Sequence, residues 1–304
     1  MKRLQVPRRL RRLIPSSITT SSSSTAAAAM AGMPKSLRIL CFGDSLTYGT
    51  NYAADTHPYS IQLEARLRQV LPRTKVSITT NGVPGDMVTW SGFAQRLKDA
   101  YQDTHFDWVI VLGGTKEFST SVAYTQFLPP SDSDLGRGRL SEDIFNALRD
   151  VWDIALVKPS KVLALTVPEC YARIGWLDSA RADLNAAIMQ WNERNFYALD
   201  IFPKMPYHSL SAEDKKNYWD DGLHFTPAGY DKLGDHVADE LIRIIYQEAK
   251  PSFSSAPAGY SSRQTDAEVD VEFEEEEDDE AEAETESSRN ISQGYVVVRK
   301  RDLD

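Results

Sequence analysis

Between residues 37 and 247, short apolar runs alternate with longer segments in which apolar residues recur every three or four positions. Short continuous apolar runs are typical of buried strands, and the three-to-four-residue period is typical of amphipathic helices. The predicted strands span residues 37–42, 75–80, 107–114, 161–169 and 196–202. The predicted helices span residues 59–71, 93–101, 141–156, 179–195 and 226–245.

Two of the predicted helices begin at a capping signal, and one connection is long. Ser141 is the expected N-cap of helix 141–156, and Thr226, followed by Pro227, is the expected N-cap of the last helix. Residues 119–140 contain the stretch LPPSDSDLGRGR, whose prolines and glycines predict a loop inserted after the third strand.

Strands that are separated by helices predict an α/β fold, with helices on both faces of a mainly parallel sheet. We therefore expect a three-layer α/β/α sandwich around a five-stranded sheet. Right-handed crossovers bring the carboxyl ends of parallel strands to one edge of the sheet, where open α/β folds bind their ligands. The residues expected at that edge are Ser45, Gly82–Gly85, Gly113–Glu117 and Pro168–Cys170.

Charge divides the 304-residue chain into three parts. Residues 1–36 carry seven Lys or Arg and no acid, whereas residues 250–304 carry sixteen Asp or Glu and six Lys or Arg. The central part, 37–249, holds the remaining 21 basic and 28 acidic residues, so the net charge of −10 is not a property of the folded part. We predict one domain over 37–249 between two disordered extensions, and nothing in this charge distribution indicates a nucleic-acid partner.

Each extension carries a hypothesis of its own. The first 36 residues are rich in Arg and Ser and lack acids, which is the composition of an organelle transit peptide and equally of a low-complexity extension. We expect a cytoplasmic location, with a mitochondrial one as the alternative. The acidic tail should stay solvated, and the Val-x-Val-x-Phe patch before its acids is a candidate docking segment for a protein partner. No apolar run is long enough to predict an integral membrane segment.

The two cysteines and the missing motifs exclude several kinds of site. Cys41 and Cys170 each lie beside a predicted strand, and we expect both to be buried free thiols rather than a disulfide scaffold or a zinc site. The sequence has no HExxH motif and no G-x-S-x-G elbow. The sequence therefore contains none of these metal-site or nucleophile motifs.

The first predicted strand ends in RILCFGDSLTYG, where Gly43 and Asp44 place Ser45 at a corner. One interpretation is an ordinary turn, since all three residue types favour turns. The other is a nucleophile at the edge of the sheet, which requires a base and a group that orients this base. Of the five histidines, His224 has Asp221 three residues before it and a helix cap two residues after it. Such a turn can place a carboxylate beside an imidazole ring.

Four blocks of the sequence resemble those of the GDSL, or SGNH, hydrolase family. They are FGDSLTYG, NGVPGD, VLGGTKEF and DGLHFTPAGY, and they occur in the family's order over nearly all of 37–247. The resemblance implies the flavodoxin-like SGNH hydrolase fold and hydrolysis of esters through an acyl-enzyme, without metal or cofactor. It also implies that Ser45 is the nucleophile, with Asp221 and His224 as its partners. The backbone amides of Ser45 and Gly85 would then hold the oxyanion.

The third block departs from the family pattern at one position. The family commonly has Gly-Gly-Thr-Asn-Asp, with the asparagine amide as an oxyanion donor, whereas this chain has Lys116 in that place. Loss of one such donor typically costs about 10²–10³ in turnover. A lysine ammonium can instead stabilise the anion, or it can pair with Glu117 and turn away, so we expect a weakened or altered site.

Three hypotheses follow. The first is a carboxylic ester hydrolase, and the absence of an evident hydrophobic lid helix favours small acyl esters as its substrates. The second is a catalytically impaired binding protein on the same fold, which Lys116 motivates. The third is an interaction protein whose output is the acidic tail.

Overall fold

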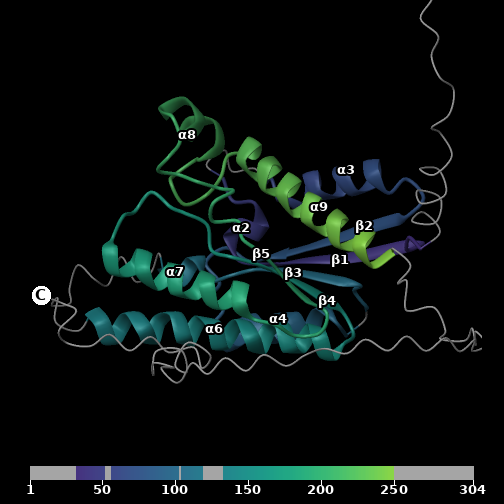
Figure 1. Ribbon diagram of the computed structural model, residues 1–304, viewed down its shortest axis with the longest axis horizontal. Helices are drawn as coiled ribbons and strands as arrows, with labels where there is room; N and C mark the ends of the chain where they lie inside the picture. The colour runs from purple at the N-terminus through teal and green to yellow at the C-terminus, as the bar shows by residue number, and fades with distance from the viewer. Residues whose placement is uncertain (1–31, 52–55, 103, 119–132, 250–304) are drawn as a thin grey trace, which may run out of the picture. The chain divides into compact units, whose positions relative to one another are not determined.

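The computed structural model describes residues 32–51, 56–102, 104–118 and 133–249. Within these ranges five strands form one sheet in which every neighbouring pair runs parallel, in the order β2-β1-β3-β4-β5 (Figure 1). The strands are β1 (Ser36–Gly43), β2 (Lys75–Gly82), β3 (Trp108–Leu112), β4 (Lys161–Leu165) and β5 (Phe196–Leu199). All five predicted strands are therefore present, and the sheet is parallel throughout.

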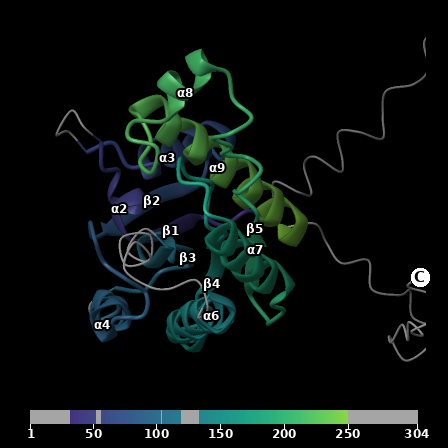
Figure 2. The same cartoon turned by 90° about the vertical axis from the view of Figure 1, so that its left-hand side faces the viewer.

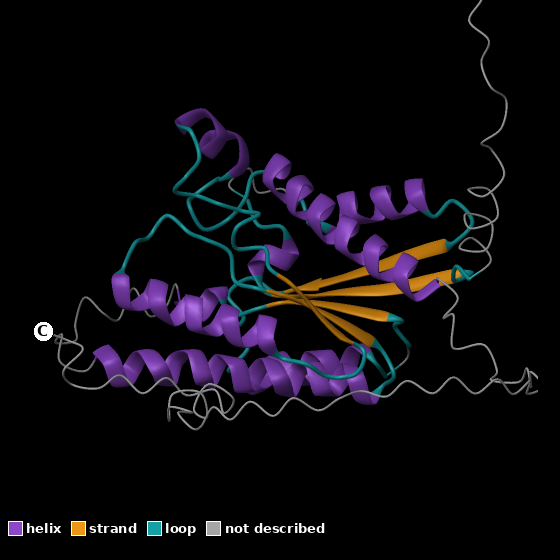
Figure 3. Ribbon diagram, viewed as in Figure 1, coloured by secondary structure: helices purple, strands orange, loops and turns teal. Residues whose placement is uncertain are grey.

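Helices cover both faces of this sheet (Figures 1 and 3). On one face lie α3 (Ser60–Val70) and α9 (Pro227–Ala249), which contact each other. On the other face lie α4 (Ser91–Ala100), α6 (Ser133–Val157) and α7 (Gly175–Gln190). The expected three-layer α/β/α sandwich is confirmed.

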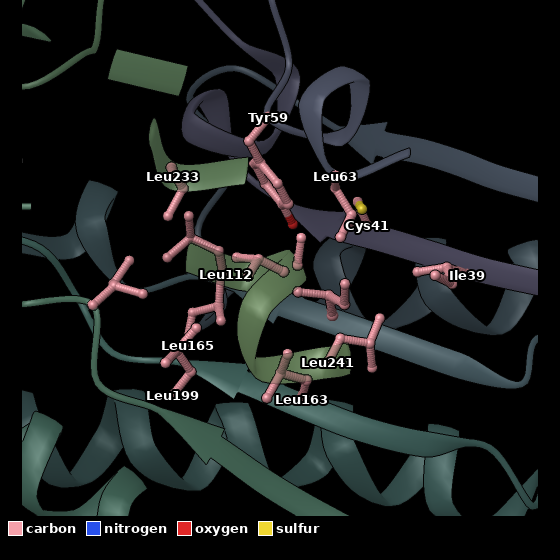
Figure 4. Close-up of a cluster of buried hydrophobic side chains, with 14 of the residues drawn as sticks. Ile39, Cys41, Tyr59, Leu63, Leu112, Leu163, Leu165, Leu199, Leu233 and Leu241 are labelled. Atoms are coloured by element: carbon pink, nitrogen blue, oxygen red, sulfur yellow. The ribbon is translucent and has the colours of Figure 1, made fainter. Parts of the chain in front are cut away.

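The alternation of side chains along β1 explains why both faces are covered. Ile39 and Cys41 belong to the buried cluster beneath α3 and α9, part of which Figure 4 shows, whereas Leu40 and Phe42 belong to the cluster beneath the opposite layer. Successive side chains of a strand point to opposite faces, so a continuous apolar run requires a layer on each side. The four side chains are completely buried.

The register of the strands aligns the carboxyl ends of β1, β2 and β3. Gly43, the last residue of β1, lies opposite Gly82 in β2 and Leu112 in β3. The three strands therefore end together, and the turns that follow them meet at the carboxyl edge. Figure 2 looks at the molecule from the end where the short helix α2 (Ser45–Tyr48) lies.

The helices differ from the prediction in two places. Helix α6 begins at Ser133 instead of residue 141, so Ser141 lies inside the helix with a buried side chain and does not cap it. Residues 133–140 of the predicted loop are thus helical, and residues 119–132 lie outside the described residues. A short helix that the sequence pattern did not predict, α8 (Ala212–Tyr218), begins after Ser211, whose hydroxyl accepts a hydrogen bond from the amide of Asp214.

The start of α9 agrees with the prediction. The hydroxyl oxygen of Thr226 accepts a hydrogen bond from the backbone amide of Gly229 at 3.2 Å, as an N-cap residue does. At the other end of the domain, the Pro34 carbonyl accepts a hydrogen bond from Thr74, so the chain joins the fold a few residues before 37. The expectations for residues 1–31 and 250–304 fall outside the described residues. In the described part, no helix has the length and apolarity needed to cross a membrane.

Candidate active site

Ser45 stands at a sharp corner between β1 and α2. The preceding residue, Asp44, caps α2, because its Oδ1 accepts a hydrogen bond from the Leu46 amide at 2.9 Å. Gly43 allows the corner to pack tightly, since a Cβ at this position would lie 2.1 Å from the Leu112 carbonyl oxygen. The close approach of β1 to β3 therefore requires glycine, and the cap fixes the start of the helix that carries Ser45.

His224 lies beside this serine. Its Nε2 atom is 2.9 Å from Ser45 Oγ, and its Nδ1 atom is 2.7 Å from Asp221 Oδ2. The three side chains form one continuous chain of hydrogen bonds from carboxylate to imidazole to hydroxyl. The structure thus brings together the three residues that the sequence singled out.

The turn that carries Asp221 and His224 is held by its own backbone. Asp221 Oδ1 accepts hydrogen bonds from the amides of Leu223 at 2.9 Å and His224 at 2.7 Å. Gly222 has a φ of +81°, which glycine adopts without strain. The amide of Asp220 donates to the His224 carbonyl at 2.9 Å and closes the turn. Carboxylate and ring therefore have little freedom to separate.

The environment of Asp221 keeps it ionised. Partial burial by itself raises the pKa of this carboxyl, but the hydrogen bonds from the His224 ring and from the two amides outweigh burial and hold the pKa below its usual value. An ionised carboxylate at Nδ1 fixes the tautomer of the ring and leaves Nε2 facing Ser45. The hydrogen bonds thus give His224 the orientation that a general base needs.

Two backbone amides near the serine are available to a ligand. Within the described residues, the amides of Ser45 and Gly85 make no hydrogen bond. Gly85 has a φ of +81° and lies in a turn after β2, in which the Asp86 amide donates to the Val83 carbonyl at 3.2 Å. Amides of this kind at the carboxyl edge can hold a developing oxyanion.

Arg96, which the sequence analysis did not single out, ties the Gly85 turn to the end of β1. Its Nη2 donates to the Gly43 carbonyl and to Asp86 Oδ2, both at 2.9 Å, and its Nη1 donates to the Asn81 carbonyl at 2.7 Å. The guanidinium also stacks on the Phe42 ring, 4.2 Å from its centroid. One arginine thereby joins the strand end before Ser45 to the turn that carries the second amide.

Lys116 lies in the helical turn that follows Gly113 and Gly114 after β3, and it is half-buried. The chain reaches this turn through Gly114, whose φ is +101°. Its neighbour Glu117 is buried, and Glu117 Oε1 accepts a hydrogen bond from the Thr89 amide at 3.2 Å. The contribution of Lys116 to the oxyanion site stays a prediction.

Two acids are buried beneath the nucleophile. Asp44 is only 1 % exposed, and burial raises its pKa to about 7, with the charges of Glu117 and Asp86 acting in the same direction and the Leu46 amide opposing them. Burial also raises the pKa of Glu117. Burial therefore favours the protonated form of both acids relative to ordinary exposed carboxyl groups.

The remaining histidines and the cysteines have other surroundings. His57 Nε2 lies 2.8 Å from Asp231, and His208 Nε2 lies 2.9 Å from the Cys170 carbonyl. Cys41 is buried, as expected, and burial raises its pKa to about 12, whereas Cys170 is only partly buried, contrary to expectation. Among the described residues, no group of three or more His, Cys, Asp or Glu side chains is arranged to hold a metal ion.

The chain is similar to known proteins in sequence and in fold. The sequence model of the GDSL-like lipase/acylhydrolase family matches residues 41–232. A comparison with curated protein sequences gave no significant match.

Among solved structures, the lipase Lip_vut3 from a goat rumen metagenome is 14% identical, with 67% of this chain and 96% of that chain covered and a TM-score of 0.50. A member of the lipolytic protein G-D-S-L family from Veillonella parvula is 17% identical, with 68% and 99% covered and a TM-score of 0.49. A carbohydrate esterase family 3 protein from Talaromyces cellulolyticus is 14% identical, with 69% and 99% covered and a TM-score of 0.48. At 14% identity, the likeness to the lipase Lip_vut3 concerns the fold alone.

Proposed function

The chain belongs to the GDSL-like lipase/acylhydrolase family, and from this premise we propose that it is a carboxylic ester hydrolase that cleaves small acyl esters through a serine acyl-enzyme. The observation that carries the proposal is the unbroken hydrogen-bond chain from Asp221 through His224 to Ser45. Serine is a weak nucleophile without a base, and here the base lies within hydrogen-bond distance and is itself oriented by a carboxylate.

The proposed reaction has two halves. His224 takes the proton of the Ser45 hydroxyl while Oγ attacks the ester carbonyl carbon, and Asp221 stabilises the imidazolium that forms. The carbonyl oxygen becomes an oxyanion, which the amides of Ser45 and Gly85 hold. The intermediate collapses as His224 gives its proton to the leaving alcohol. Water then attacks the acyl-enzyme with the same histidine as base, which releases the acid and restores Ser45.

The presence of Lys116 in place of the family's asparagine bears on the expected turnover rate. In the family pattern an asparagine amide completes the oxyanion site, and a lysine with a flexible four-carbon stem is less preorganised than a short amide. We propose that turnover is reduced by the absence of this third donor, which is typically worth about 10²–10³ in rate.

The direct test is hydrolysis of p-nitrophenyl acetate and butyrate by the full chain and by Ser45→Ala and His224→Ala. We expect each substitution to lower kcat by at least about 10³, because nucleophile and base act as one unit. Circular dichroism and thermal melting check that the variants are folded. Unchanged turnover in a folded Ser45→Ala variant would overturn the proposal.

Lys116 also supports a second candidate, a non-catalytic binding protein on the same fold. This protein would bind acids or esters in the site without turning them over. Isothermal titration of the full chain with a carboxylic acid that binds, together with complete absence of p-nitrophenyl ester turnover, would favour it over the hydrolase.

The proposals for the two extensions are independent of the site. A protein partner for the acidic tail predicts that truncation after residue 249 abolishes partner binding while ester hydrolysis continues. A mitochondrial or a cytoplasmic location is tested by fluorescence microscopy of the tagged full chain beside a chain that starts at residue 32.

A further inference from the structure

Arg96 on α4 uses all the hydrogen-bond donors of its guanidinium at the carboxyl edge of the sheet. Its Nε donates to Asp86 Oδ2 at 3.3 Å, and its Nη2 donates to the same oxygen and to the Gly43 carbonyl, both at 2.9 Å. Its Nη1 donates to the carbonyl and to the side-chain oxygen of Asn81, both at 2.7 Å. A guanidinium has five N–H groups, so these contacts engage each of them. The charged end of Arg96 is therefore fixed in position and in orientation.

Two aromatic rings also hold the guanidinium. Its central carbon lies 4.2 Å from the centroid of the Phe42 ring and 4.9 Å from that of the Phe93 ring. A cation over an aromatic face is attracted by the ring, and the arginine side chain is only 18 % exposed. A lysine in this place would bring three donors on a compact ammonium, which matches neither the planar stacking nor the forked hydrogen bonds. Arg96→Lys therefore keeps the charge and removes most of the geometry.

The Gly43 carbonyl is the point where the two candidate amide donors are connected. It accepts one hydrogen bond from Arg96 and another from the Val83 amide at 3.1 Å. Gly43 lies two residues before Ser45, and Val83 lies two residues before Gly85. One carbonyl therefore links the corner that carries the first amide to the turn that carries the second.

The turn that carries Gly85 is held at both of its ends. The Asp86 amide donates to the Val83 carbonyl and closes the turn, and Pro84 followed by Gly85 with a φ of +81° is typical of a type II turn. The Val83 end is tied to the end of β1, and the Asp86 end is tied to Arg96. Removal of the guanidinium would release the second end and leave a carboxylate that is only 13 % exposed without this cation.

The position of the turn matters because an oxyanion site depends on where its donors lie. A donor stabilises the oxyanion when it lies about 2.7–3.1 Å from the place that this oxygen occupies. In the proposed reaction the two donors are the amides of Ser45 and Gly85, which belong to separate turns. A misplacement of about 1 Å can lower a rate by about 10²-fold. The group that connects the two turns therefore decides whether both amides can bind the same oxygen.

We infer that Arg96 is a positioning residue for the oxyanion, because it holds the Gly85 amide where this amide and that of Ser45 can bind the same oxygen. The inference rests on the proposed ester hydrolysis. Arg96 acts through the Asp86 carboxylate and the Gly43 carbonyl rather than on the ester itself. Its loss should lower kcat and leave KM nearly unchanged, since the oxyanion develops only as the transition state is reached.

The kinetic test uses p-nitrophenyl butyrate and the full chain. Arg96→Lys should lower kcat by about 10–100-fold with KM within about twofold of the wild type. Asp86→Asn, which keeps the other contacts of the arginine, should lower kcat by about fivefold. The matched control is Arg66→Lys, which alters an arginine that joins α3 to α9 through Asp235 and Asp239 and should change neither constant. Wild-type kcat in the folded Arg96→Lys or Asp86→Asn variant, or a raised KM at unchanged kcat, would overturn the inference.

A trifluoromethyl ketone with a short alkyl chain separates positioning from a general loss of stability. An activated serine adds to its carbonyl, and the oxygen of the tetrahedral adduct then occupies the oxyanion site. The inhibition constant of the ketone should rise in Arg96→Lys by the factor by which kcat/KM falls. A smaller folded fraction would lower the apparent kcat and leave the inhibition constant unchanged, and this result would overturn the inference.

A measurement on the turn itself needs no turnover. Hydrogen exchange followed by mass spectrometry reports on the amides of Val83 and Asp86, both of which donate hydrogen bonds in the wild type. The peptide that contains them should exchange at least about tenfold faster in Arg96→Lys, and at the wild-type rate in Arg66→Lys. Equal exchange in Arg96→Lys and the wild type would overturn the inference. Faster exchange in a chain that hydrolyses no ester would leave Arg96 as the residue that fixes this turn and would overturn the hydrolase proposal.

Discussion

His224 Nε2 lies 2.9 Å from Ser45 Oγ, although 179 positions separate the two residues in the chain. Two independently fixed turns produce this contact. Asp44 caps the helix that begins at Ser45, and Thr226 caps α9 just after His224. The parallel sheet brings these turns to one edge, and the caps determine where the two side chains point. The contact therefore depends on local turn chemistry as well as on the fold.

The negative charge of Asp221 should contribute more to kcat than the size of its side chain. Asp221→Asn keeps an oxygen for the two backbone amides but removes the carboxylate that orients and stabilises the protonated ring. We expect kcat for p-nitrophenyl butyrate to fall by about 10³–10⁴ with little loss of thermal stability. A kcat within tenfold of the wild type would show that His224 is oriented by other groups.

Gly222→Ala should damage the site through the backbone. The residue has a φ of +81°, and a Cβ there would lie 2.5 Å from the Cβ of Tyr171. We expect a loss of about 1–3 kcal/mol in the free energy of unfolding and a fall of more than tenfold in kcat/KM. Gly92→Ala is the matched control, since a Cβ at Gly92 meets nothing within 4 Å. Similar stability and activity for the two variants would contradict the claim that this turn is tightly held.

Lys116→Asn tests the altered oxyanion position. An asparagine amide is shorter and better preorganised than the lysine side chain, so we expect kcat to rise by at least about tenfold with KM little changed. Lys116→Ala separates the two possible roles of the lysine, because removal of a donating lysine would lower kcat. An asparagine variant that is slower than the wild type would show that Lys116 already stabilises the oxyanion.

Asp44 should make stability fall as pH rises. Its pKa is raised from 3.8 to about 7 in the folded protein, so between these values the folded state holds a proton that the unfolded chain has released. The free energy of unfolding therefore decreases with pH across this window. Asp44→Asn keeps an acceptor for the Leu46 amide and has no proton to lose.

Urea unfolding at pH 5, 6, 7 and 8 measures this difference. Relative to Asp44→Asn, the wild type should lose a few kcal/mol between pH 5 and pH 8, since one pKa unit corresponds to about 1.4 kcal/mol. Curves that stay parallel over the whole range would mean that Asp44 is ionised throughout.

The sequence predicted β1, β3 and β4 well because these strands are apolar and buried over most of their length. Runs such as 37–42 have no polar alternation that could be mistaken for a surface strand, and glycines mark their ends. The same glycines identified the carboxyl edge, and with it Ser45. The proximity of Asp221 to His224 was also predictable, because both residues belong to one short turn.

The helical errors have physical causes. Gly136 and Gly138 each disfavour a helix by about 1 kcal/mol relative to alanine, so the start of α6 reads as a loop, although the helix extends over it. Helix α8 has no buried residue, so its sequence lacks the apolar periodicity from which an amphipathic helix is predicted.

The pocket beside the Asp221 turn, whose lining includes Thr115, Cys170 and Leu177, was not predictable from periodicity. Its walls come from the turn after β3, the loop after β4, α7 and the Asp221 turn, which are far apart in the sequence. Arg96 was missed for a similar reason, because its three carbonyl and carboxylate partners become neighbours only when β1 and β2 pair. Hydrogen-bond partners that are brought together by strand pairing cannot be recognised from neighbouring residues in the sequence.

The central claim is that Ser45 is a nucleophile activated by His224. Its most direct measurement is mass spectrometry of the folded chain after reaction with a fluorophosphonate, which is attacked by an activated serine and is then retained as a stable adduct. We predict one adduct per chain on the peptide that contains Ser45, and none in Ser45→Ala or His224→Ala. A folded wild type that stays unmodified, or that carries the adduct on another residue, would contradict the claim.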